Sequence, residues 1–216
     1  MPLSEDWPIA ADYAGALEAV LAELAIDDAI LVGHSLGTRV AASHARHFGE
    51  RLSALVLMSP SLGFGAPRGG PMHAAARARL DEFEALGPAC YAAARAAQIV
   101  HDPASKPQLV AELAETMATM TQPGYGQAVR MLASGRLLDD VAQRRLPLLI
   151  LCGEEDKITP PDMARRVEAT GSARANAPTR LGLLPGAGHM IYLEATQAVA
   201  SLLLEFEKTL SPRHAK

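Results

Sequence analysis

The sequence has few cysteines, few aromatic residues, and no long run of hydrophobic or basic residues. Cys90 and Cys152 are the only cysteines among 216 residues, and they stand far apart, which excludes a disulfide framework and a cysteine metal site. No apolar run approaches the roughly 20 residues that cross a membrane, and residues 1–7 lack the basic and apolar parts of a secretion signal. We therefore expect a cytoplasmic protein.

Neither sign of charge dominates the chain. Lys and Arg total 20 against 24 Asp and Glu, which gives a net charge of −4. Because no basic stretch stands out, nucleic acid and membrane surfaces are not indicated as partners. Hydrophobic residues make up 49% of the sequence, enough for one substantial core. These values favour a single globular domain, with room for a subdomain, that acts on a small neutral or mildly polar molecule.

Short apolar runs alternate with helical patterns along the chain. Each run is too brief for a helix and apolar on both faces, as in a buried parallel strand. The helical patterns include an apolar stripe from Asp12 to Leu24 and another from Ala198 to Phe206. We expect an α/β fold with a mostly parallel sheet flanked by helices. Its strands are predicted over residues 29–33, 54–58, 146–152 and 179–184.

A long insertion separates the second and third predicted strands. It is rich in Ala, Leu, Met and Glu, which are good helix formers, and Pro88 and Pro107 stand where a first helical turn tolerates proline. We expect residues 61–143 to form a helical cap over a core of residues 1–60 and 144–216. Helices are predicted near residues 74–86, 89–99, 107–120 and 124–134.

The segment Gly33-His34-Ser35-Leu36-Gly37 matches the G-x-S-x-G pattern directly between a predicted strand and a predicted helix. So tight a turn strains the serine backbone, and side chains at positions 33 and 37 would be expected to collide with neighbouring elements. Ser35 is thus a candidate nucleophile, and the Leu36 N–H is a candidate oxyanion donor. The alternative is a purely structural glycine-rich turn.

A serine nucleophile needs a base, and the base needs a partner that fixes its tautomer. Asp156 follows the third predicted strand and is the candidate acid, with Glu154 and Glu155 as rivals on the same loop. His189, in a glycine-rich loop after the fourth predicted strand, is the candidate base. The alternatives are solvated loop carboxylates and a histidine that only packs.

The remaining histidines offer weaker candidates. His34 lies beside the nucleophile, either as a substrate contact or as a structural neighbour of the turn. No histidine pair has the H-E-x-x-H or another zinc-ligand spacing, so neither a metal nor another cofactor is expected.

The order Ser35, Asp156, His189, each after a parallel strand, resembles that of the α/β-hydrolase superfamily, and the resemblance covers nearly the whole chain. The turn at Gly33–Gly37, the loop of Asp156 and the loop of His189 look most like those of the 3-oxoadipate enol-lactonase and carboxylesterase-like branch, whose members have a helical cap. This resemblance implies hydrolysis of a small ester or lactone through an acyl-enzyme. Relatives also include C–C bond hydrolases, cofactor-free haloperoxidases and acyltransferases.

The sequence departs from that family at its start. Family members begin with several strands, and a loop after one of them supplies the second oxyanion donor. Residues 1–11 contain Pro2, Pro8 and no strand-length apolar stretch, so we expect an amino-terminally truncated fold. Strand 29–33 would then be an edge open to self-association. Losing one oxyanion donor costs about 100- to 1000-fold in rate. The alternative function is a catalytically impaired fragment or interaction module.

Overall fold

The computed structural model describes residues 7–173 and 177–210, which contain a four-stranded sheet. All neighbouring strands are parallel, and their order across the sheet is their order in the chain. Every predicted strand is present within two residues of its expected bounds; β3 starts late because Pro147 has no N–H to donate. The strands are β1 (Ala29–His34), β2 (Leu52–Met58), β3 (Leu148–Gly153) and β4 (Thr179–Leu184).

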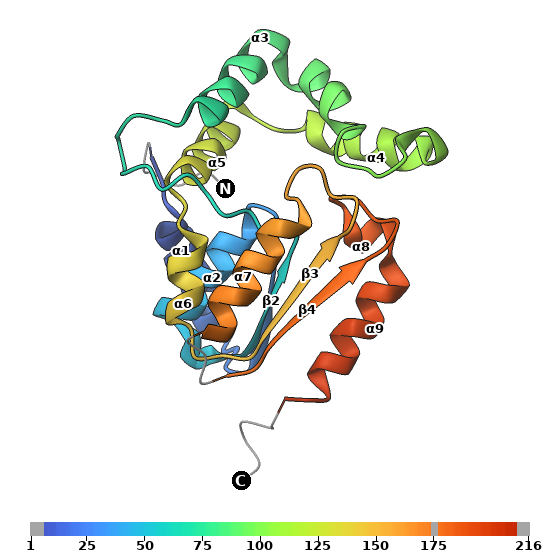
Figure 1. The fold of residues 1–216 in the computed structure, drawn as a ribbon. Coiled ribbons are helices and arrows are strands. Elements are labelled where there is room, and N and C mark those ends of the chain that lie inside the picture. The colour runs from blue at the N-terminus through green and yellow to red at the C-terminus, as the bar shows by residue number, and fades with distance from the viewer. Residues whose placement is uncertain (1–6, 174–176, 211–216) are drawn as a thin grey trace.

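Helices cover both faces of this sheet (Figure 1). On one face lie α2 (Gly37–His47), α6 (Leu137–Gln143) and α7 (Pro161–Ala173), and α1 (Ala10–Glu23) packs against α2. On the other face lie α8 (Ile191–Glu194) and α9 (Thr196–Glu207). Short 3-10 turns, η1 (Gly49–Arg51) and η2 (Pro103–Ser105), complete the connections.

Strand β2 explains why the predicted strands lack a polar face. Leu55 and Leu57 pack toward α2, α6 and α7, while Ala54 and Val56 pack toward α8 and α9. All four side chains are inaccessible to solvent. Because alternate residues of a strand point to opposite faces, a strand covered on both sides must be apolar throughout.

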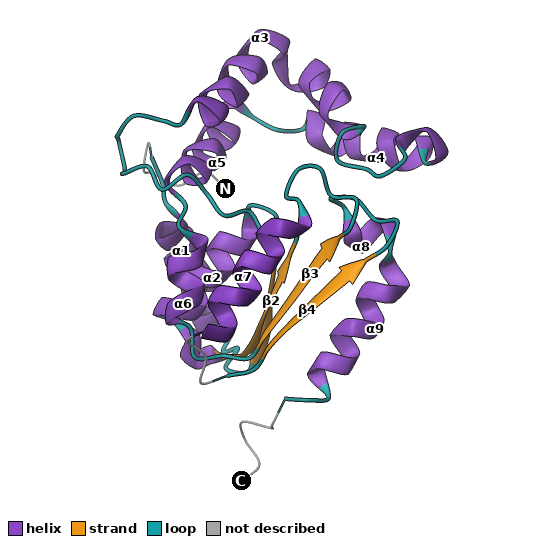
Figure 2. Ribbon diagram, in the orientation of Figure 1, coloured by secondary structure: helices purple, strands orange, loops and turns teal. Residues whose placement is uncertain are grey.

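Three helices lie over the carboxyl ends of the strands (Figure 2). They are α3 (Ala74–Ala96), α4 (Pro107–Ala118) and α5 (Gln122–Ser134). The predicted break before Pro88 is present as a kink at Gly87, whose φ is 70°. The short helix α6 was not predicted, and although it falls within residues 61–143 it packs on α2 and α7. The division into core and cap therefore stays a proposal.

A buried arginine ties the helix after Ser35 to this upper layer. Arg39 of α2 is fully buried, and its guanidinium donates to the carbonyls of Ser61, Met131 and Leu132 at 2.7–3.0 Å and to Ser61 Oγ at 3.1 Å. A Cβ at Gly135 would lie 2.1 Å from this guanidinium, so glycine is required there. Burial, with a smaller contribution from the charge of Arg79, lowers the pKa of Arg39 to about 9.

The sheet ends at β1 among the described residues. Val32 shares its face with Val56, its partner in register, yet 46% of Val32 is exposed because no helix of the described ranges covers it. No helix in the described ranges is long and apolar enough to cross a membrane.

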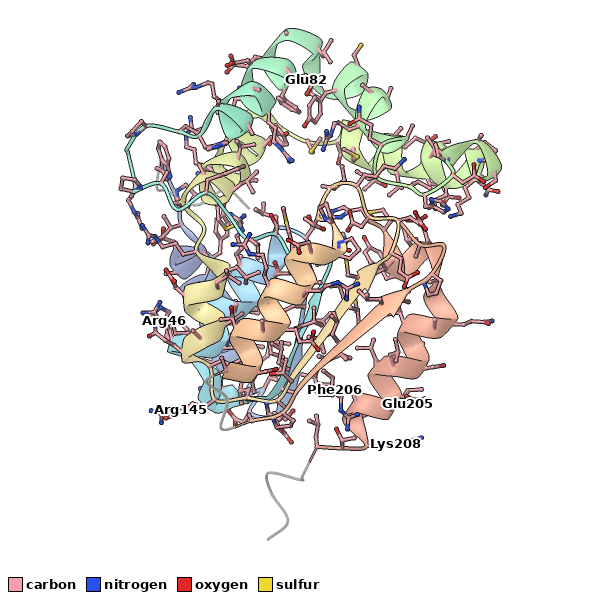
Figure 3. All side chains as sticks on the ribbon, in the orientation of Figure 1. Arg46, Glu82, Arg145, Glu205, Phe206 and Lys208 are labelled. Carbon is pink, nitrogen blue, oxygen red and sulfur yellow. The ribbon has the colours of Figure 1, made fainter. Side chains whose placement is uncertain are left out.

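Two positions on α9 test how much this helix contributes to stability. Phe206 points toward the sheet (Figure 3). It is 2% exposed, whereas Leu204 is 57% exposed. Phe206→Ala should lower the free energy of unfolding by about 3–5 kcal/mol, because it leaves a cavity beneath the helix. Leu204→Ala, as the control, should change it by less than about 1 kcal/mol. Denaturant titration measures both, and similar losses would contradict the packing described.

Candidate active site

Ser35 stands at the turn between β1 and α2 in a strained backbone conformation. Its φ is 51°, in the left-handed region that residues other than glycine rarely adopt. The turn is held by the Ser35 N–H, which donates to the Met58 carbonyl at 2.9 Å. A Cβ at Gly33 would lie 2.6 Å from the Gly37 carbonyl oxygen, so only glycine fits at position 33.

The expectation of crowding at Gly37 was wrong. A Cβ built there meets no heavy atom of the described residues within 4 Å, since it faces open space rather than a neighbouring strand. The two glycines of the pattern therefore differ: Gly33 is sterically required, and Gly37 is not.

The structure brings the three predicted triad residues together. Ser35 Oγ lies 2.9 Å from His189 Nε2, and His189 Nδ1 lies 2.9 Å from Asp156 Oδ2. The three side chains come from the loops after β1, β3 and β4, whose carboxyl ends meet at one edge of the sheet. Asp156 and His189 are buried. The imidazole can thus accept the Ser35 proton at one nitrogen while it donates to the carboxylate from the other.

Asp156 is held as a carboxylate by its surroundings. Oδ1 accepts the backbone N–H groups of Ile158 and Thr159, each at 2.8 Å. Burial raises the pKa of Asp156, but the hydrogen bonds from His189 and Thr159 and the charge of His189 outweigh burial and leave that pKa below its usual value. The rival carboxylates Glu154 and Glu155 are both exposed.

Thr159 belongs to this cluster, although its sequence context gave no signal for it. Its hydroxyl donates to Asp156 Oδ2 at 2.8 Å and lies 3.1 Å from the Ser59 carbonyl and 3.2 Å from His189 Nδ1. Thr159 thus bridges the acid, the base and the end of β2. Only the fold brings Ser59 and His189 to Thr159, because both are distant from it in sequence.

His34 supports the base loop rather than the cavity wall. Its Nε2 lies 2.8 Å from the His189 carbonyl oxygen, and its ring centroid lies 4.9 Å from that of His189 and 5.0 Å from that of Tyr192. Burial, with a smaller effect of the His189 charge, lowers the pKa of His34 to about 4. A neutral His34 can donate this bond from Nε2, which fixes the position of the base backbone.

A buried carboxylate anchors the same loop from the other side. The Glu194 side chain is fully buried and accepts the N–H groups of Gly188 at 3.1 Å and Met190 at 3.2 Å. It also accepts the His101 N–H at 2.8 Å and pairs with Lys106 at 2.9 Å. Since His101 and Lys106 lie between α3 and α4, Glu194 joins the loop of His189 to the upper helical layer.

A cavity of about 270 Å³ opens beside Ser35. The upper layer and the sheet layer both contribute to its wall, which is largely apolar. Leu36 lines it, and in the described part of the chain the Leu36 N–H donates no backbone hydrogen bond, so it is available to an oxyanion. The described residues hold no group of three or more His, Cys, Asp or Glu side chains arranged for a metal ion. The other residues around the cavity are Ser61, Leu62, Gly63, Phe64, Arg79, Tyr125, Ala128, Val129, Leu132, Ile158, Thr159, Met163 and Arg166.

The pKa of His34 predicts a pH dependence of stability. With a pKa of about 4 in the folded chain and 6.5 in its unperturbed state, His34 takes up a proton on unfolding between these values. The folded state therefore loses stability as pH falls from about 6.5 to 4. His34→Gln keeps an N–H donor without the titration, and it should reduce this loss by on the order of 1–3 kcal/mol.

Denaturant titrations at pH 7 and pH 4 on both proteins measure the difference. Other titrating groups, including His44, are common to both proteins and cancel. Equal losses in the two proteins would contradict a neutral His34.

Comparisons with known proteins identify the family of this chain. Residues 2–202 match the sequence pattern described as the alpha/beta hydrolase family. The AB hydrolase superfamily protein YisY of Bacillus subtilis is 25% identical over 198 residues, which cover 89% of this chain and 71% of that protein.

Solved structures share the fold. A thermophilic esterase from Thermogutta terrifontis, in a malate-bound structure, has a TM-score of 0.80 and 20% identity and matches 96% of this chain and 74% of its own. The enol-lactonase from Burkholderia xenovorans LB400 has a TM-score of 0.81 and 17% identity, with coverages of 93% and 74%. The four-stranded sheet is shortened relative to such full-length neighbours. With its family pattern spanning most of its length, the chain belongs to the alpha/beta hydrolase family.

Proposed function

We propose that this chain is a serine hydrolase that cleaves a small ester or lactone through an acyl-enzyme. The observation that carries the proposal is the continuous hydrogen-bonded chain from Ser35 through His189 to Asp156 at the wall of a cavity. Esterases and an enol-lactonase among the structural neighbours support the choice of substrate class. A volume of about 270 Å³ favours a small acyl group.

The first half of the proposed reaction transfers the acyl group to Ser35. Ser35 Oγ attacks the carbonyl carbon while His189 Nε2 takes the hydroxyl proton, and Asp156 stabilises the imidazolium that forms. The tetrahedral intermediate collapses as the bond to the leaving oxygen breaks, and His189 returns the proton to that oxygen. In a lactone the leaving oxygen stays attached to the acyl chain.

The second half releases the acid. A water molecule gives a proton to His189 and attacks the acyl carbon, and the bond to Ser35 Oγ breaks as His189 protonates that oxygen. In both halves the Leu36 N–H would donate to the oxyanion. A single donor leaves the rate about 100- to 1000-fold below that of a site with two.

A specific observation keeps a rival function open. The chain matches 74% of the length of the Thermogutta terrifontis esterase and 74% of that of the enol-lactonase. Its sheet is shorter than the sheets of such neighbours. The rival hypothesis is a catalytically impaired hydrolase fragment or interaction module, which retains the triad residues without turnover.

A fluorophosphonate probe separates these two functions, because it reacts only with an activated serine. We expect the purified chain to be labelled and Ser35→Ala not to be labelled. Absence of labelling in a chain shown to be folded by circular dichroism would favour the rival hypothesis. Labelling without ester or lactone turnover would point to another reaction of the same nucleophile.

The acid can be tested against a matched neighbour. Asp156→Asn should lower kcat for an ester by about 10⁴-fold, because the amide favours the wrong imidazole tautomer. Glu155→Gln, on the same loop but exposed, should leave kcat within about twofold. Comparable losses in both variants, measured by steady-state kinetics, would remove Asp156 from the triad.

We also propose that the open edge of strand 29–33 pairs with a second copy of this chain. The outer backbone groups of an edge strand are available to another strand, and the exposed Val32 adds apolar surface beside them. Light scattering should show a mass that rises with protein concentration. Val32→Lys should shift the distribution toward the monomer, since a charge on the edge opposes pairing. A monomer at all concentrations would contradict the proposal.

A further inference from the structure

Among the described residues, the charged side chains in the wall of the cavity that contains Ser35 are both arginines. Arg79 comes from α3 and Arg166 from α7, so they approach the cavity from different layers, and no Asp or Glu of the described ranges lines it. Most of the remaining wall is apolar, formed by residues such as Leu62, Val129 and Leu132. An apolar pocket for a purely neutral ester has no need of two guanidinium groups.

These two arginines lack carboxylate partners within the described ranges. No hydrogen bond or ion pair joins Arg79 or Arg166 to an Asp or Glu there, in contrast to Arg46, Arg51 and Arg136, which all have one. Tyr125, which also lines the cavity, does not supply a negative charge, because burial and its hydrogen bond to Tyr91 raise the pKa of its hydroxyl. The positive charge in the wall is therefore not neutralised locally.

A second hollow lies next to the cavity, and Arg79 and Ile158 line both of them. Arg95 and Lys157 also line that hollow, and Asp102 is the one carboxylate among its described lining residues. Positive charge thus extends from the cavity into its neighbour. Such a charged, low-dielectric cleft raises the local concentration of anions and steers them toward the site.

From these observations we infer that the ester or lactone carries a free carboxylate, which binds Arg79 and Arg166 while Ser35 attacks the carbonyl. The inference rests on the proposed hydrolase function and names its substrate class. A guanidinium presents paired N–H donors that match the geometry of a carboxylate. We assign a carboxylate rather than a phosphate ester because the mostly apolar wall supplies few further donors for a dianion.

A pair of aryl esters of equal shape tests this inference. 4-Nitrophenyl hemiglutarate ends in a carboxylate, whereas 4-nitrophenyl 5-methylhexanoate ends in an isopropyl group of similar shape. We expect kcat/KM of the full chain to favour the anionic ester by about tenfold or more, the value of one or two charge-assisted hydrogen bonds. The Ser35→Ala protein gives the background of spontaneous hydrolysis.

Arginine variants locate the source of that preference. Arg79→Leu and Arg166→Leu should each lower the preference by on the order of tenfold, mainly through a higher KM for the anionic ester, and Arg79→Lys should restore part of it. Arg77→Leu on α3 and Arg165→Leu on α7 are matched controls, because each lies on the same helix as one of the two pocket arginines and neither lines the cavity. A preference that is absent, or that survives both pocket variants, would overturn the inference.

A binding measurement decides the inference even if turnover is absent. Monomethyl glutarate should bind the Ser35→Ala chain in calorimetry, and adding Arg79→Leu should weaken its Kd by about tenfold. No binding, or binding unchanged by Arg79→Leu, would overturn the carboxylate site. Tighter binding of inorganic phosphate would replace it with a phosphate site. Failure of fluorophosphonate labelling, by contrast, would count against the hydrolase proposal alone.

Discussion

The close approach of Gly33 to Gly37 is the constraint on which the site depends. Because the backbone passes itself at a distance that admits no Cβ at position 33, the chain must turn sharply from β1 into α2. This turn places Ser35 at a φ of 51° and directs its hydroxyl toward the carboxyl edge of the sheet. A serine at the same edge without that turn would follow the strand or the helix and would not reach His189.

The base is positioned mainly through its backbone. His34 and Ser59 both hydrogen-bond the His189 carbonyl oxygen, and Glu194 holds the N–H groups on either side of His189. The imidazole is then oriented by Asp156 and Thr159. Since these supports come from the ends of β1, β2 and β3 and from α8, an assembled site requires the whole sheet edge rather than one loop.

Much of the fold could be predicted because local sequence determined it. A strand buried on both faces must be apolar throughout, so β2 and β3 could be predicted. Glycine-rich segments after strands indicated Ser35 and His189, and a carboxylate in the loop after the third strand indicated Asp156. Arg39, Thr159 and Glu194 could not be found in this way. Each has at least one partner far away in the sequence, such as Met131 for Arg39, His189 for Thr159 and Lys106 for Glu194. An isolated arginine or glutamate is, moreover, typical of an exposed surface.

The overall charge of the chain does not indicate the charge around the cavity. The net charge is −4, yet the described residues of the cavity wall include two arginines and no acid. Gly37 was expected to be crowded, but the position where a neighbouring strand would lie is open here.

The buried carboxylate of Glu194 has a consequence for how this protein can change over evolution. It binds the loop of His189 and the segment between α3 and α4 at the same time. A substitution near His101 or Lys106 that alters the upper helices therefore also displaces the base. The α3–α4 segment and the loop of His189 are thus not free to change independently, whereas α5, which makes no hydrogen bond or ion pair with Glu194 in the described ranges, can change without disturbing that loop.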